Sequence, residues 1–149
     1  IAENGVAIDA IISDFISGAV EWLSPDNEED HWDIIEGQGS LFHPSFAGVS
    51  LGLLHGSQPD KFIVCHEPTR SNMRGVKNKL PSISEVISKT IELGKLTNPD
   101  IKCAGIALNT SNMLNKSDDM KKMISDKHSI PCLDPLKDDL SDFINMINK

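Results

Sequence analysis

The stretch Lys61-Phe62-Ile63-Val64-Cys65-His66 is a short apolar run that ends in a histidine, and it predicts a buried β-strand. A second run of the same kind spans residues 101–108. Between the two, Pro81 begins a segment whose apolar residues recur at helical spacing, namely Ile83, Val86, Ile87 and Ile91. A strand, a helix and a strand in this order predict a βαβ unit with parallel strands.

The same alternation continues on both sides of this unit. Shorter apolar runs predict two further strands, at residues 32–36 and 130–133. Helices are expected over residues 7–23, 44–55, 113–127 and 136–147. Four strands that alternate with helices across short connections favour an α/β fold of three layers, in which helices cover a parallel sheet on both faces. No repeat or Pro/Ser-rich linker indicates a second domain.

The composition excludes several classes of protein. The 149 residues include 14 Lys and Arg against 22 Asp and Glu, and the net charge of -8 disfavours a nucleic-acid binder. No apolar run approaches the roughly 20 residues of a transmembrane helix. The cysteines form no CxxC motif, which indicates a reducing, cytoplasmic setting. We therefore expect a cytoplasmic protein with a small-molecule substrate and no nucleic-acid or membrane partner, and the start at Ile1 suggests a piece of a longer protein.

In a parallel sheet, ligands gather beyond the carboxyl ends of the strands, so the segments that follow the strands are the candidate sites. Glu36 closes the first predicted strand and is followed by Gly37-Gln38-Gly39-Ser40. An acid followed by two glycines suits a metal-bound phosphate or an oriented water molecule. A plain tight turn with a solvated Glu36 fits the same pattern. The chain contains no GxxxxGK[ST] phosphate loop.

The segment after residues 61–66 contains His66, Arg70 and Arg74. Two arginines beside a strand-terminal histidine, in an otherwise acidic chain, could bind an anion through two-pronged hydrogen bonds. His66 could titrate near neutral pH. The alternative is an exposed loop whose arginines pair with the surplus carboxylates.

Polar residues also follow the last two predicted strands. Asn109 and Thr110 come directly after residues 101–108, and Asp134 follows residues 130–133. An asparagine at the end of a buried strand can pair its amide with the edge of a nucleotide base. Taken alone, the pattern favours the alternative that Asn109 or Ser111 caps the next helix. The base or ribose of a nucleotide could also lie near Asp134. The spacing of the histidines matches no zinc site.

Several of these segments together resemble the C-terminal P-loop domain of the D-glutamate N-acetyltransferase (DgcN-type) family. The resemblance runs over nearly the whole chain, and its most specific parts are the EGQGS segment at residues 36–40 and the His66, Pro68 and Arg70 pattern. The other matching segments are Gly5–Ala10, Asp14-Phe15, Gly18–Glu21, Asp33–Ile35, His43-Pro44 and Asn109-Thr110.

The resemblance implies a P-loop NTPase-like fold, similar to dethiobiotin synthetase, in an incomplete form. The family's glycine-rich Walker A loop and its Rossmann-like N-terminal domain lie upstream of the segment that resembles Gly5–Ala10. Residues 1–149 would then be the C-terminal part of the P-loop domain, and inactive alone. By position, Glu36 corresponds to the acid of the Walker B-like strand and so to a metal ligand. Asn109 corresponds to the base-proximal asparagine, and Arg70 to an anion anchor.

Three functions stay open. The first is N-acyl transfer from acetyl-CoA to an acidic amino acid such as D-glutamate, with Arg70 or Arg74 on a carboxylate and His66, His43 or Glu36 as the general base. The second is an ATP-dependent ligase or kinase in which Glu36 engages Mg²⁺. The third is a noncatalytic nucleotide-binding or assembly module. Homo-oligomers are expected if an apolar sheet edge is exposed.

Overall fold

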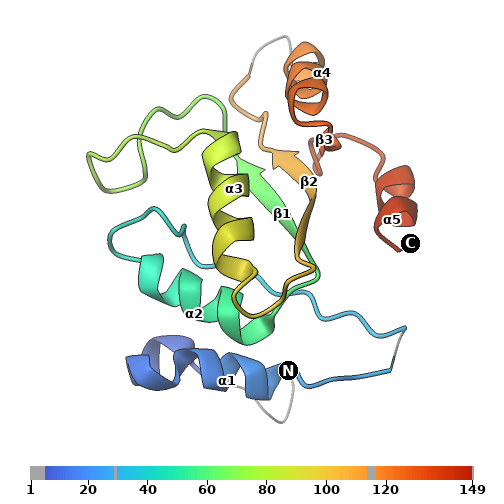
Figure 1. The fold of residues 1–149 in the computed structure, drawn as a ribbon. Coiled ribbons are helices and arrows are strands. Elements are labelled where there is room, and N and C mark those ends of the chain that lie inside the picture. Colours follow the sequence, from blue (N-terminus) through green and yellow to red (C-terminus); the bar gives the residue numbers. More distant parts are fainter. Residues whose placement is uncertain (1–5, 29, 114–116, 149) are drawn as a thin grey trace. The chain divides into compact units, whose positions relative to one another are not determined.

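The structure is a computed structural model that describes residues 6–28, 30–113 and 117–148. The chain divides into two compact units, one made of residues 1–60 and 92–101 and the other of residues 61–91 and 102–149. The regular elements are the helices α1 (Ile16–Leu23), α2 (Ala47–Ser57), α3 (Ile83–Gly94), α4 (Ser117–His128) and α5 (Ser141–Ile147), and the strands β1 (Lys61–His66), β2 (Lys102–Leu108) and β3 (Cys132–Leu133) (Figure 1). None of the helices in these described ranges is long and apolar enough to cross a membrane.

The second unit contains a three-stranded sheet in the order β1-β2-β3. Both neighbouring pairs are parallel: Val64 lies opposite Ile106, and Ala107 lies opposite Leu133. The first pairing is the one expected of β-strands joined through a helical crossover. The α/β fold and the strand over residues 61–66 are therefore confirmed. The later strands are confirmed with shorter bounds than expected, and β3 has only two residues.

The core of this unit lies on one face of β2. Ile106 and Leu108 are both fully buried, and they pack with Val64 and with Ile124 of α4. Apolar residues of α3 and α4 complete the cluster, among them Ile83, Val86, Ile87 and Met120. Because side chains alternate across a strand, Gly105 faces the other way. A Cβ atom on Gly105 would lie 2.7 Å from the Phe143 ring, so α5 covers the opposite face. Within this unit, the predicted three layers are present.

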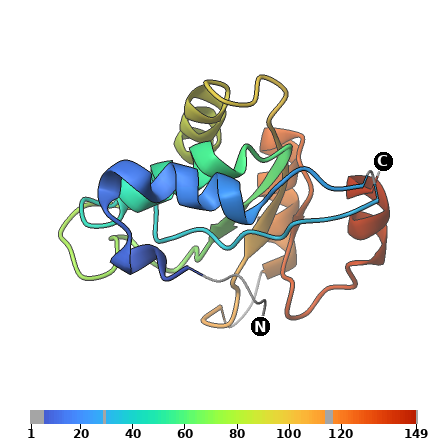
Figure 2. The same ribbon diagram turned by 90° about the horizontal axis from the view of Figure 1, so that it is seen from below.

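In the first unit, α1 packs closely along α2 (Figures 1 and 2). The buried residues of α1 are Ile16 and Val20, and they lie against glycines of α2. A Cβ atom on Gly52 would lie 2.5 Å from Cγ2 of Ile16. One on Gly56 would lie 2.7 Å from Cβ of Val20 and closer still to the backbone carbonyl of Ser17. The absence of side chains at these positions allows the two helices to approach.

The predicted strand at residues 32–36 is wrong. This segment has no regular structure and pairs with no strand in the described part of the chain. Ile34 is 92% exposed, and Ile35 is also exposed. An apolar composition does not by itself make a strand, because the N–H and C=O groups need a neighbouring backbone to bond. The segment is therefore an extended surface stretch in this structure.

The predicted helix over residues 7–23 is wrong in its first half. That half forms two 3₁₀ turns, Ile8–Ala10 and Ser13–Phe15, and α1 begins only at Ile16. Between the turns the backbone is extended, with ψ angles of 135° at Ile11 and 133° at Ile12. β-Branched isoleucines are stiff in a helix, and the following Ser13 and Asp14 favour turns and helix starts.

Three other helices begin later than predicted. Pro44 lies in a turn in which Nδ1 of His43 accepts the N–H of Ser45 at 3.1 Å, and α2 starts at Ala47 and not at Pro44. The helix expected from residue 136 starts at Ser141, because side chains of the preceding loop bond to its own backbone. The helix expected over residues 113–127 spans Ser117–His128, and residues 114–116 lie outside the described residues.

We expect Gly56→Ala to lower the free energy of unfolding by about 1–3 kcal/mol, because the added Cβ overlaps the backbone of α1. Gly48→Ala is the matched control on the same helix. A Cβ there meets nothing within 4 Å, so the change should be neutral or should stabilise by about 0.5–1 kcal/mol. Urea unfolding of both variants measures the difference. Equal stability of the two variants would refute the close packing of α1 on α2.

Candidate functional site

The carboxyl ends of β1 and β2 lie side by side at one edge of the sheet. The pairing of the two strands extends one residue past β2, where the N–H of Asn109 donates to the carbonyl of His66 at 2.9 Å. His66 and Asn109 therefore share one edge of the sheet, as parallel strands require. Residues 36–40 belong to the other unit, so their place at this edge stays a prediction.

His66 ends β1 and is half-buried. Burial lowers the pKa of its imidazole below the ordinary value of 6.5. Two charges on the following turn act in opposite directions: Glu67 raises the pKa, and Arg70 lowers it. With the pKa lowered, His66 is neutral at pH 7 and can accept a proton.

Arg70 lies on the turn that follows His66. Its Nε atom is 3.7 Å from Oε2 of Glu67, and its Nη2 atom donates to the carbonyl of Asn72 at 3.5 Å. The Thr69 hydroxyl donates to the other carboxylate oxygen of Glu67. The Arg70 side chain is 41% exposed, and such ion pairs contribute little stability. The planar guanidinium has five N–H donors, so a pair this loose leaves it able to bind an anion.

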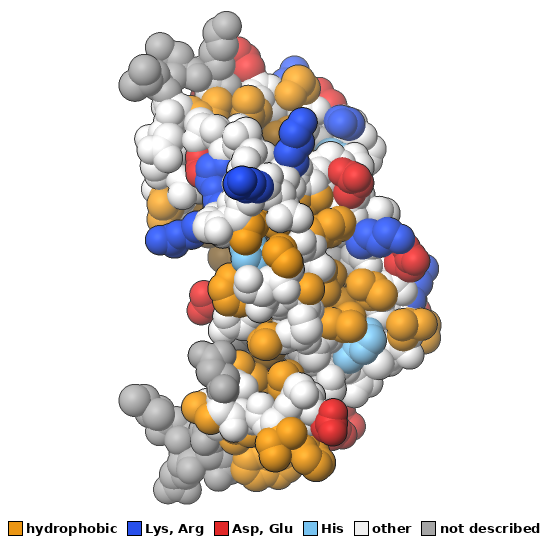
Figure 3. Space-filling view, turned by 90° about the vertical axis from the view of Figure 1, so that its left-hand side faces the viewer, with side chains coloured by type: hydrophobic (Ala, Val, Ile, Leu, Met, Phe, Trp, Pro, Cys, Tyr) orange, Lys and Arg blue, Asp and Glu red, His pale blue; other side chains and the backbone are white. Residues whose placement is uncertain are grey.

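Arg74 lies on a hairpin that continues from this turn, and this hairpin comprises residues 71–80. Its two legs are joined by the N–H of Met73, which donates to the Asn78 carbonyl at 2.9 Å, and by the N–H of Leu80, which donates to Ser71 at 3.0 Å. Gly75 turns the chain with a φ of 76°. Figure 3 shows Lys and Arg side chains gathered in the upper half of the face that carries this loop. Arg74 was a candidate from the sequence, whereas the lysines of the hairpin were not.

Thr110 and Asp134 join the ends of β2 and β3. Both are buried, with exposed fractions of 0% and 1%, and the Thr110 hydroxyl donates to Oδ2 of Asp134. The N–H of Leu136 donates to Oδ1 at 3.0 Å. Lys137 closes the group, because its Nζ lies 2.6 Å from the Thr110 hydroxyl and 3.7 Å from the Asp134 carboxylate. The hydrogen bond from Thr110 holds the pKa of Asp134 below its ordinary value, although burial opposes the shift.

Asp138 extends this group toward α4. Its carboxylate accepts the N–H of Asp134 at 2.7 Å and both of its oxygens accept from Lys121, at 2.6 and 2.7 Å. Lys121, Lys137 and Asp138 were not among the candidates from the sequence. A signal was present in the Asp134 to Asp138 segment, where two acids flank a lysine after a strand, but its partners come from other elements.

These contacts bear on the predicted base-proximal residues Asn109, Thr110 and Asp134. The polar atoms of Thr110 and Asp134 bond to each other and to their neighbours inside the protein. Asn109 is exposed, and its Oδ1 accepts the N–H of Ser111 at 3.0 Å in a local turn. Asn109 does not cap a helix here, because its side chain closes this turn and residues 111–113, which follow, are not helical. A role for these residues beside a nucleotide base stays a prediction.

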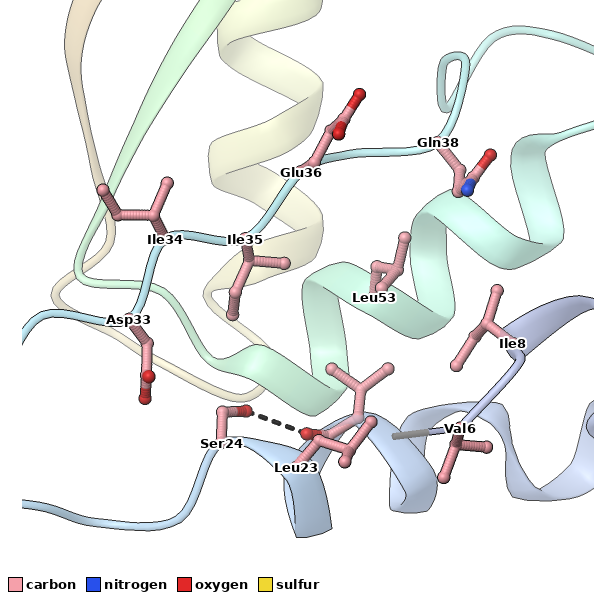
Figure 4. A pocket seen from close by; sticks show the side chains of 11 residues that line it. Val6, Ile8, Leu23, Ser24, Asp33, Ile34, Ile35, Glu36, Gln38 and Leu53 are labelled. Atoms are coloured by element: carbon pink, nitrogen blue, oxygen red, sulfur yellow. Dashed lines mark hydrogen bonds between the residues drawn. The ribbon is translucent and has the colours of Figure 1, made fainter. Parts of the chain in front are cut away.

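The first unit contains the other predicted site residues and a cavity of about 520 Å³ (Figure 4). The apolar lining includes Val6, Ile8, Val20, Leu23, Ile35 and Leu53. Glu36 lies at the edge of this cavity, is exposed, and points away from Leu53 in Figure 4. Nowhere in the described ranges do three or more His, Cys, Asp or Glu residues form a group that could hold a metal. Glu36 as a metal ligand stays a prediction.

The segment Gly37-Gln38-Gly39-Ser40 is held against the start of α2. The Ser50 hydroxyl donates to the carbonyl of Gln38. Gly39 has a φ of 49°, and a Cβ there would lie 2.9 Å from the Phe46 side chain. The Ser40 hydroxyl oxygen accepts the N–H of Phe42 at 3.1 Å. The anion-binding role predicted for these residues is untested.

His43 is buried before α2. Its Nδ1 accepts the N–H of Ser45 at 3.1 Å, and its ring lies 4.7 Å from that of Phe46. This nitrogen is thereby engaged in shaping the turn. His66 lies at the shared strand edge of the second unit, whereas His43 and Glu36 belong to the first unit, and the catalytic role of all three stays a prediction.

We expect Thr110→Val to lower the free energy of unfolding by about 1.5–3 kcal/mol at pH 7, because it removes a donor to a buried carboxylate. The pKa of Asp134 is lower in the folded protein, so this stabilisation is present above pH 3.8 and is lost as the pH falls through the folded value. Urea unfolding from pH 7 to 3 measures the change. Thr69→Val, at an exposed hydroxyl, is the control, and an equal effect of both substitutions would contradict the account.

The comparisons with known proteins agree with this architecture. The family model described as a domain of unknown function (DUF1611_C) P-loop domain matches residues 1–144. A crystal structure at 2.30 Å resolution of a DUF1611 family protein from Anabaena variabilis ATCC 29413 is similar with a TM-score of 0.81. Its sequence is 28% identical, and the match covers 96% of this chain and 44% of that one.

Two curated relatives are both called D-glutamate N-acetyltransferase. The protein from Pseudoalteromonas sp is 53% identical over 146 residues, which are 97% of this chain and 44% of the relative. The protein from Tritonibacter scottomollicae is 44% identical over 139 residues, which are 92% of this chain and 42% of the relative. The chain thus spans less than half the length of these relatives. The resemblance found in the sequence is confirmed, and the chain belongs to the DUF1611 P-loop domain family.

Proposed function

We propose that this protein transfers an acetyl group from acetyl-CoA to the amino group of D-glutamate. The observation that carries the proposal is a proton acceptor and a cation at one strand end: His66, with a lowered pKa, and Arg70, on the turn that follows it. The reaction itself is inferred from the relatives that are 53% and 44% identical, because both are called D-glutamate N-acetyltransferase. D-Glutamate presents an amine to deprotonate and carboxylates to bind.

In this proposal, the residues at the strand edge have separate tasks. Arg70 binds a carboxylate of D-glutamate through paired N–H donors. His66 takes a proton from the substrate ammonium group, so that the nitrogen can attack the thioester carbonyl carbon. The C–N bond forms as the C–S bond breaks, the electron pair leaves on sulfur, and the second proton lost from the nitrogen protonates the CoA thiolate. Asn109, whose backbone is bonded to that of His66, lies beside the reacting groups.

The direct test offers the full-length protein acetyl-CoA or ATP together with a panel of D- and L-amino acids. We expect isotope from labelled acetyl-CoA to appear in N-acetyl-D-glutamate, with no ATP consumed. ATP hydrolysis coupled to ligation or phosphorylation would favour the ligase or kinase alternative, for which the P-loop description is the supporting observation. Nucleotide binding without turnover would favour a noncatalytic module.

Arg70→Lys should weaken D-glutamate binding by about 10- to 150-fold, the equivalent of 1.5–3 kcal/mol for a charge-assisted contact. Lysine keeps the charge but lacks the planar, two-pronged geometry, so it should be nearly as harmful as alanine. Affinities for D-glutamate and for CoA are measured separately in Arg70→Lys and Arg74→Lys. Wild-type affinities for both ligands in both variants would show that Arg70 and Arg74 do not bind the substrate or CoA, and would favour an exposed loop.

The pH dependence identifies the base. Since the pKa of His66 lies below 6.5, its neutral form is present at pH 7, and kcat should fall on acidification through that lowered value. His66→Gln should reduce kcat by about 10²- to 10⁴-fold and abolish this acidic limb. Glu67→Gln should move the limb to lower pH, because Glu67 raises the His66 pKa. An acidic limb that is unchanged in His66→Gln would exclude His66 as the base.

A further inference from the structure

We propose that the hairpin of residues 71–80 binds the phosphate groups of the acyl donor, with Lys77 and Lys79 as its main cations. This inference rests on the proposed function, in which the donor is a CoA thioester. It assigns the donor's nucleotide end to a part of the chain separate from the acetyl-transfer residues.

The charge distribution of the hairpin sets it apart from the rest of the chain. The chain has a net charge of -8, yet no Asp or Glu occurs from Pro68 to Ser84. Both arginines of the chain lie in this interval, together with Lys77 and Lys79. A dense, uninterrupted positive segment in an acidic protein creates a local field that attracts anions.

Two other lysines of the second unit, Lys121 and Lys137, form ion pairs with carboxylates. Lys121 pairs with Asp118 and Asp138, at 2.9 and 2.6 Å. Lys77 and Lys79 are exposed, and the ion pairs found among the described residues include neither. Within residues 6–28, 30–113 and 117–148, no carboxylate forms an ion pair with either lysine, and a bound anion would supply the counter-charge.

The hairpin is a formed structure and not merely a charged sequence. Besides the backbone bonds that join its legs, Asn72 and Lys79 form an antiparallel bridge, and the amide of Asn72 donates to the Lys77 carbonyl at 3.5 Å. Met73 is 7% exposed and anchors one leg in the protein. These contacts hold the lysine-bearing leg in place before a ligand arrives, which reduces the entropy lost on binding.

The position of the hairpin suits the shape of the donor. It emerges from the loop after His66, and Figure 1 shows this loop projecting away from the sheet between β1 and α3. Lys79 lies opposite Asn72 on the returning leg, and Lys77 lies nearer the turn at Gly75, so the two lysines follow one another along the hairpin. In CoA, the pantetheine chain separates the thioester from the phosphates. With the phosphates on the hairpin, the pantetheine chain would carry the thioester toward His66.

Phosphate is the ligand chemistry that the hairpin favours. Lysine acts as a compact point charge and binds phosphate well, whereas the paired N–H groups of Arg70 suit a carboxylate. ATP carries phosphates too, and the 3′-phosphate distinguishes CoA from ATP. The binding measurements must therefore compare CoA with ATP and with dephospho-CoA.

The test measures the affinity of the full-length protein for CoA, adenosine 3′,5′-bisphosphate, dephospho-CoA, ATP and D-glutamate by calorimetry. The double variant Lys77→Ala/Lys79→Ala should weaken CoA and the bisphosphate by about tenfold or more, with a shallower dependence on salt. D-Glutamate affinity should not change. Lys77→Arg/Lys79→Arg should retain CoA binding, which shows that the hairpin still folds.

Lys122→Ala/Lys127→Ala is the matched control, because it removes the same charge from exposed positions on α4. Wild-type CoA affinity in the hairpin variant, or an equal loss in this control, would overturn the proposal. The proposal would also be overturned if the hairpin variant lost affinity for ATP alone, or if the wild-type protein bound neither CoA nor the bisphosphate. Hairpin-dependent CoA binding without acetylation of D-glutamate would overturn only the proposed function.

Discussion

The parallel pairing of β1 with β2 is the constraint on which the candidate site depends. Burial of Ile106 and Leu108 fixes which face of β2 is inside, and the register then places His66 opposite Leu108. The bond from the Asn109 N–H to the His66 carbonyl carries that register one residue beyond the strand. The loops that follow His66 and Leu108 are far apart in the sequence, and this hydrogen bond joins their first residues. Neither loop can therefore move at that point without breaking the bond.

The buried Asp134 reinforces this arrangement from the other side of β2. Its carboxylate accepts bonds from Thr110 and Leu136, and Lys137 balances its charge. A buried carboxylate is tolerated only when its oxygens are satisfied in this way. The short strand β3 has only two residues of ladder, so these side-chain bonds are what secure its end to β2. The exposed Asn109 directly precedes Thr110, so the bonds that hold Thr110 also restrain the backbone of Asn109.

Sequence reasoning succeeded where the pattern is local and failed where a partner is required. Residues 61–66 form a short apolar run that is followed by a helix. The strand in the structure has the predicted limits. Residues 32–36 look similar, but in this structure they have no neighbouring strand, and composition cannot reveal that. The shared edge of His66 and Asn109 followed from parallel topology alone. The contacts of Lys137 with Thr110 and of Asp138 with Lys121 join segments that are distant in the sequence, so the pattern of one segment cannot predict them.

The central claim is that the β1 and β2 edge is the place of acetyl transfer, and its most direct measurement is a crystal structure of the full-length protein with D-glutamate and CoA. The account predicts a D-glutamate carboxylate on the Arg70 guanidinium, the amino nitrogen within hydrogen-bond distance of the His66 imidazole, and the CoA phosphates beside Lys77 and Lys79. D-Glutamate and the CoA thiol bound elsewhere, with His66 and Arg70 facing only solvent, would contradict it.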